Sequence, residues 1–300
     1  MPLTICILAL CILASGFSGN LYKKLSAASE GVSASLTMPA VWFLMLAVFF
    51  GAFSAATREL PDASAIPIAL LAGAGIATAS SILIESMKKV SLSISLIIMN
   101  LNFIIPVILS ALFLHIPAAP LQLAGMLLSI TVIVLLNMTP GASAGGEKPS
   151  KAAILLPLLA SIANGLVNFC ITINGNHGSP PMFFFAVTYG SGAVFCLIIG
   201  LITHKSHGGK GFPIGKASFK AALLPMLLLG LCNGVCFYTE RLLAEGRMNP
   251  AALFTTVTCA SIALSLAVGF AFQGDKLTKK SVISMIFCVI AILCQHSGIA

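Results

Sequence analysis

The feature that most constrains this chain is a succession of apolar runs separated by short polar segments. An apolar helix of about 20 residues crosses the hydrocarbon core of a bilayer. Such a helix satisfies its backbone hydrogen bonds internally, which lipid cannot do for it. We therefore predict an all-α integral membrane protein with ten transmembrane helices, over residues 3–22, 35–56, 64–87, 91–114, 118–137, 153–174, 181–203, 219–243, 249–272 and 279–297.

Composition supports a membrane environment. Hydrophobic residues make up 58% of the chain and charged residues 8%, against about 25% charged residues in a soluble domain. The net charge of +8 is therefore interpreted as loop charge that sets topology, and no nucleic-acid partner is expected. The nine cysteines form no CxxC pair, so Cys232 and Cys236 are interpreted as packing residues, with no metal or cofactor. No basic residue precedes the first apolar run, which we interpret as an uncleaved span.

A Gly-rich segment near the middle divides the chain into two sets of five expected spans. Residues 1–137 form the first set, 138–152 a linker, and 153–300 the second set. Because five is odd, equivalent helices of two such repeats run in opposite directions through the membrane. Inverted repeats are typical of secondary transporters, whose substrate site lies between the repeats near the bilayer midplane.

The basic residues of the loops alternate along the chain. Numbered from the N-terminus, odd loops contain 13 lysines and even loops only Arg58, Arg241 and Arg247. The positive-inside rule places the odd loops in the cytoplasm and both termini outside.

Local motifs point to a known family. Tyr238 precedes the run Asn249-Pro250-Ala251-Ala252-Leu253, and the next apolar run ends in Gln273-Gly274-Asp275-Lys276. With these residues the chain resembles the drug/metabolite transporter superfamily, in its ten-span EamA-like branch, over essentially its whole length. In the first half Pro106 fits the proline of the fourth span, whereas Ile116-Pro117 stands where the family has a glycine and an acid. The resemblance implies alternating-access transport of small metabolites, often proton-coupled or by exchange, with both termini cytoplasmic.

Polar side chains inside apolar spans are the candidate site residues, because in lipid they turn toward a partner or a cavity. Asn164, Asn168 and Thr172 are each four residues apart and share one helix face. They predict either a hydrogen-bonding wall of a substrate cavity or contacts between helices. Asn100 and Asn102 are two residues apart, so we expect only Asn100 to face the cavity, with a kink at Pro106. The candidate substrate-binding residues are Asn100, Asn164, Asn168, Asn233, Tyr238, Thr255 and Thr258.

Two acids are candidates for carrying a coupling proton, namely Glu85 and Glu240. Burial would raise the pKa of either carboxyl and allow that role. Each also has a simpler interpretation, because Lys88 and Lys89 follow Glu85 and Arg241 follows Glu240.

These features predict a secondary-active carrier of a small uncharged or zwitterionic metabolite, such as an amino acid, sugar or nucleoside. A flippase for a lipid-linked substrate and an intramembrane enzyme are the alternatives. We do not expect an enzyme, because the five histidines fall at span ends or in loops and no HExxH or GxSxG motif occurs inside a span. Expected partners are the substrate, the bilayer and, as open alternatives, a coupling proton and a second copy in a homodimer. The expected location is the plasma membrane, as in a bacterial inner membrane.

Overall fold

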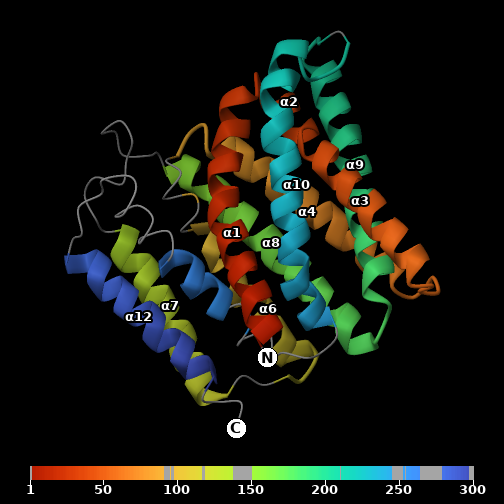
Figure 1. The fold of residues 1–300 in the computed structure, drawn as a ribbon. Helices are drawn as coiled ribbons and strands as arrows, with labels where there is room; N and C mark the ends of the chain where they lie inside the picture. Colours follow the sequence, from red (N-terminus) through yellow and green to blue (C-terminus); the bar gives the residue numbers. More distant parts are fainter. Residues whose placement is uncertain are drawn as a thin grey trace.

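A computed structural model describes residues 2–90, 95, 98–116, 119–137, 151–209, 211–244, 253, 255–263 and 279–296. These residues form helices and connecting turns (Figure 1). The helices are α1 Pro2–Ala28, α2 Val32–Thr37, α3 Pro39–Ala56, α4 Ile66–Ser86, η1 Asn100–Phe103, α6 Ile104–Phe113, α7 Pro120–Asn137, α8 Lys151–His177, α9 Pro181–Ser206, α10 Lys216–Ala244 and α12 Lys279–His296. Residues 255–263 are helical as well.

Five helical stretches among the described residues are long and apolar enough to cross a membrane. Shorter apolar helices cover Asn100–Phe113, Pro120–Val132 and Val282–Cys294. The chain is therefore a multi-pass membrane protein, and the expected number of ten spans stays a prediction. The five stretches are Val32–Ala56, Ile66–Ser86, Ile154–His177, Pro181–Ser206 and Lys216–Cys236.

Proline and glycine mark several helix ends. Pro39 and Pro181 occupy the first turn of α3 and α9, where the missing N–H has no helical partner to lose. Gly178 after α8 and Gly208 after α9 have φ of 70° and 75°, the left-handed conformation that ends a helix. The linker expected at 138–152 ends earlier than predicted, because α8 already begins at Lys151. Residues 138–150 lie outside the described residues.

The segment expected as one kinked span over 91–114 has a different local structure. A 3₁₀ turn, η1, leads directly into α6, and Pro106 lies in the first turn of α6. The departure from a regular α-helix therefore lies in η1, in the turn before Pro106. Lacking an N–H, Pro106 cannot bond the carbonyl of Asn102, which leaves the preceding turn free to adopt the tighter form.

The helices pack in a small set of pairs. Helix α1 lies against α10, α3 against α9 and α10, α4 against α8 and α9, and α7 against α12. Figure 1 shows α7 and α12 side by side, apart from the larger group that contains α1, α3, α4, α9 and α10. Aromatic rings fill the contact between α3 and α9, where Phe50 stacks on Tyr189 with centroids 5.6 Å apart.

One end of the bundle brings together loops that the sequence analysis numbered one, three and seven. Lys23 Nζ donates a hydrogen bond to the Met87 carbonyl at 2.9 Å. The Ser218 hydroxyl donates to the Glu30 carboxylate. These contacts place three of the lysine-rich loops at the same end.

The opposite end brings together loops two and six. The Ser179 hydroxyl donates to the Asp62 carboxylate at 2.5 Å, and the Phe183 backbone N–H donates to Glu59 at 2.9 Å. Hydrogen bonds from Ser179, and then from Ser64, hold the pKa of Asp62 below its ordinary value. Loops one, three and seven therefore lie at the opposite end of the bundle from loops two and six, as expected of helices that alternate in direction.

Close approach of α4 and α9 depends on a glycine. A Cβ at Gly73 would meet the side chain of Ser191 and lie 2.5 Å from the Thr188 carbonyl oxygen. At Gly51 a Cβ would meet only Ala186, at 4.0 Å.

We expect Gly73→Ala to lower the free energy of unfolding by about 1–3 kcal/mol, because α4 must move away from the α9 backbone. The matched variant Gly51→Ala should be neutral or stabilising by up to about 1 kcal/mol. Thermal unfolding of the purified protein in detergent measures both. Equal midpoints for the two variants would contradict the packing described here.

Candidate functional site

A cavity of about 210 Å³ lies among α1, α4, η1, α8, α10 and the helix over 255–263. Most of its lining side chains are polar although the helices that carry them are apolar. None of the described lining residues carries a formal charge. The polar ones are Ser15, Ser18, Tyr22, Ser80, Asn100, Asn102, Asn164, Asn168, Asn233, Thr258 and Ser261.

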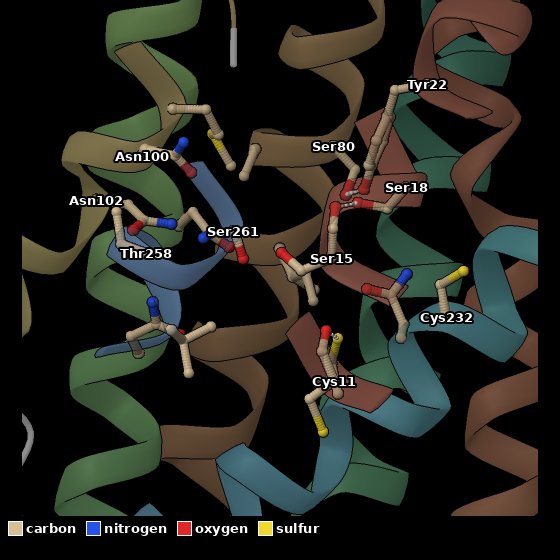
Figure 2. A pocket seen from close by; sticks show the side chains of 18 of the residues that line it. Cys11, Ser15, Ser18, Tyr22, Ser80, Asn100, Asn102, Cys232, Thr258 and Ser261 are labelled. Atoms are coloured by element: carbon tan, nitrogen blue, oxygen red, sulfur yellow. Dashed lines mark hydrogen bonds between the residues drawn. The ribbon is translucent and has the colours of Figure 1, made fainter. Parts of the chain in front are cut away.

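Four of the five asparagines that line the cavity belong to two elements. Asn100 and Asn102 belong to η1, and Asn164 and Asn168 are one turn apart on α8. All four are half-buried. Their side-chain amides have no hydrogen-bond partner among the described residues. In Figure 2 Asn100, Asn102, Thr258 and Ser261 gather on one side of the cavity.

Helix α8 also fixes the position of η1. A Cβ at Gly165 would lie 2.7 Å from the Asn102 carbonyl oxygen and 2.7 Å from Cβ of Ile105, so only glycine permits this contact. The Ser161 hydroxyl lies within hydrogen-bond distance of the Met99 carbonyl, at 3.5 Å. One face of α8 therefore carries two of the amides and positions the two others.

Several side chains on the opposite side of the cavity have partners within the protein. The Tyr22 hydroxyl lies 3.3 Å from the Ser80 hydroxyl and bridges α1 to α4. The Ser18 hydroxyl donates to the Ser15 carbonyl at 2.7 Å, as Figure 2 shows. Asn233 donates to the Leu229 carbonyl of its own helix at 3.0 Å.

Sulfur atoms line this same side. Cys11, Cys232 and Cys236 all border the cavity. The Cys11 thiol donates to the Val235 carbonyl at 3.1 Å and joins α1 to α10. Cys232 and Cys236 were predicted to be packing residues only. Cys232 is one residue before Asn233 and Cys236 is three residues after it, and this spacing could have indicated that both line the cavity.

The structure brings five of the seven predicted substrate-binding residues to the cavity. They are Asn100, Asn164, Asn168, Asn233 and Thr258.

The other predicted residues lie elsewhere. Thr255 is fully buried and does not line the cavity, although it lies one turn before Thr258 on the same helix. The side chains of Tyr238 and Glu240 lie outside the described residues. Glu85 also lies apart from the cavity, near the end of α4, and its carboxylate pairs with Lys88 at 2.8 Å.

The expectation that Asn100 and Asn102 could not both face the cavity is wrong. Both line it, because the cavity extends around the 3₁₀ turn rather than along one face of a straight helix. Tyr22 and Phe43 were also missed. Their position depends on Trp42, whose ring contacts Tyr22 at 6.1 Å and Phe43 at 5.3 Å between centroids.

Among the described residues no group of three or more histidine, cysteine, aspartate or glutamate side chains is arranged to hold a metal ion. The cavity therefore offers amides, hydroxyls and thiols as its chemistry.

Comparison with solved structures shows a shared fold. A solved structure described as "Crystal structure of protein" matches with a TM-score of 0.63, over 95% of this chain and 96% of that chain, at 16% sequence identity. This likeness shows that the fold is shared with a protein of nearly the same extent. No family model matches the chain. No curated protein matches it.

Access of water to the cavity is testable with thiol chemistry. We expect a small water-soluble methanethiosulfonate to modify Cys232, which is half-buried and lines the cavity, much faster than Cys196. Cys196 is the matched control, because it is 2% exposed and packs between α9 and α4. Thiolate attack needs a hydrated thiol, so reagent access decides the rate. Peptide mass spectrometry after timed labelling reads both sites, and equal rates would contradict a water-filled cavity.

Proposed function

We propose that the protein is a secondary-active carrier that moves a small polar metabolite across a membrane by alternating access. The observation that carries the proposal is the cavity of about 210 Å³, lined by uncharged polar side chains inside apolar helices. A polar group in lipid is unfavourable unless it has a partner, and an enclosed solute supplies one. The cavity is below the range of drug-sized sites, which suits a small solute.

The pairing of helices supports two inverted repeats of five spans. Let α1, α2–α3, α4, η1–α6 and α7 correspond in order to α8, α9, α10, the helix over 255–263 and α12. Several of the helix pairs then have an equivalent. The pair α1–α10 maps onto α8–α4, and α3–α10 maps onto α9–α4. The pairs α3–α9 and α7–α12 map onto themselves. The lining helices also divide into three equivalent pairs, with α1, α4 and η1 matching α8, α10 and 255–263.

The same arrangement supports a transporter of the drug/metabolite type and an orientation. The lysine-rich end is proposed to be cytoplasmic by the positive-inside rule. The motif residues at 249–252 and 271–278, on which much of the resemblance depends, lie outside the described residues.

Solute counterflow in proteoliposomes tests the carrier. Sugars, amino acids, nucleosides and nucleobases are offered in turn, with the same unlabelled solute inside. We expect Ser15→Trp to abolish counterflow, because the indole ring would occupy much of the cavity that Ser15 lines. Leu13→Trp is the matched control, since Leu13 lies on the same helix and is 51% exposed toward lipid.

Both variants must elute as folded protein with unchanged thermal midpoints for the comparison to count. Counterflow that survives Ser15→Trp would contradict this cavity as the path. Vesicles that accumulate no solute but flip a lipid-linked sugar would replace the carrier with a flippase.

The response of transport to a pH gradient tests the roles of the two candidate acids, Glu85 and Glu240. We expect Glu85→Gln to retain transport and its response to a pH gradient, because Glu85 lies apart from the cavity. Its carboxylate pairs with Lys88 and accepts a hydrogen bond from the Ser35 hydroxyl at 3.0 Å. The substitution should lower the thermal midpoint. Glu240→Gln is measured beside it, and loss of the gradient response in Glu85→Gln would contradict the structural role given to Glu85.

A further inference from the structure

The two sides of the cavity differ in how much hydrogen-bonding capacity they leave free. Asn100, Asn102, Asn164 and Asn168 present side-chain amides with no partner among the described residues. Each amide offers two N–H donors and a carbonyl acceptor. Groups of this kind at buried or half-buried positions are normally bonded to protein or to water, so these four amides are available to a solute that displaces water from the cavity.

The facing side offers much less. The Tyr22 and Ser80 hydroxyls pair with each other, the Ser18 hydroxyl bonds the Ser15 carbonyl, and one N–H of Asn233 bonds the Leu229 carbonyl. The Ser15 hydroxyl and the rest of the Asn233 amide stay available to a solute. What remains on that side is mostly apolar or weakly polar, with Phe43, Ile76 and Ala79 beside the thiols. A solute that fills the cavity therefore meets most of the available amide groups on one side.

We propose that the substrate is an uncharged solute with adjacent N–H and C=O groups along one edge and a less polar body, of the nucleobase or cyclic-amide class. This inference rests on the proposed carrier function. An asparagine amide carries a donor and an acceptor side by side, and it pairs with the same arrangement in reverse order through two hydrogen bonds, as asparagine does with adenine. The planar body then lies against Phe43 and the thiols.

Two other solute classes fit less well. A sugar carries hydroxyls around its whole ring, and those facing Phe43, Ile76 and Ala79 would lose water without a replacement. A zwitterionic amino acid would bring a carboxylate and an ammonium into a cavity whose described lining residues carry no charge. Burying an unpaired charge is more unfavourable than burying a neutral amide.

Binding to the purified full-length protein in detergent tests the inference, with uracil, cytosine, 1,3-dimethyluracil, glucose and alanine as probes in calorimetric titration. We expect uracil or cytosine to bind. The dimethylated base has no N–H group left, and it should bind about tenfold more weakly or not at all, since a good bidentate pair discriminates at that level. This comparison needs no variant.

Single variants then test whether the asparagine amides bind the N–H and C=O edge of the base. Asn168→Ala and Asn102→Ala should each weaken binding of the base about tenfold, while the thermal midpoint without ligand changes little. Asn20→Ala is the control, because Asn20 is an exposed asparagine of α1 that does not line the cavity.

The outcomes separate this inference from the carrier function. Binding of glucose or alanine in place of the bases, weakened by the same variants, would contradict the proposed nucleobase-like substrate. It would not contradict the proposed carrier function. Base binding that is unchanged by 1,3-dimethylation or by the asparagine variants would overturn the proposed substrate class as well. Absence of binding by all five probes would also contradict the proposed substrate class. The counterflow assay tests the carrier function independently of this result.

Discussion

The constraint on which this structure depends is that a polar group surrounded by lipid must find a partner inside the protein or at a cavity. Helix α8 meets that constraint with four residues within two turns. Asn164 and Asn168 face the cavity, Ser161 reaches the backbone of the neighbouring segment, and Gly165 lets that segment approach. Without the glycine the backbone at Asn102 would have to move, and the second pair of amides would move with it.

Different forces hold the two sides of the cavity. On the side of α1 and α3, packed rings set the geometry, because Trp42 contacts both Tyr22 and Phe43 edge-on. On the other side a 3₁₀ turn carries two amides, and its form follows from the N–H that Pro106 lacks. The second side depends on the close backbone contact between Gly165 and Asn102.

Helical spacing explains which site residues could be predicted. Asn164 and Asn168 are four apart, so any α-helix places them on one face, and both line the cavity. Asn102 was excluded because the prediction assumed a regular α-helix and a flat cavity wall, and neither assumption holds there. Thr255 was included because it is polar, but its side chain is fully buried outside the cavity. For Glu85 the basic neighbours in the sequence did indicate its partner, since Lys88 pairs with it.

The sequence by itself determined that this is a helical multi-pass membrane protein, because the length and apolarity of its runs admit no other solution in lipid or in water. It also determined which polar side chains had to turn inward. Only the tertiary structure decided which of them meet. The cavity joins side chains from α1, η1, α8 and α10, and such contacts depend on helix packing and on local breaks in helix geometry. Neither is encoded in the spacing of residues along a single helix.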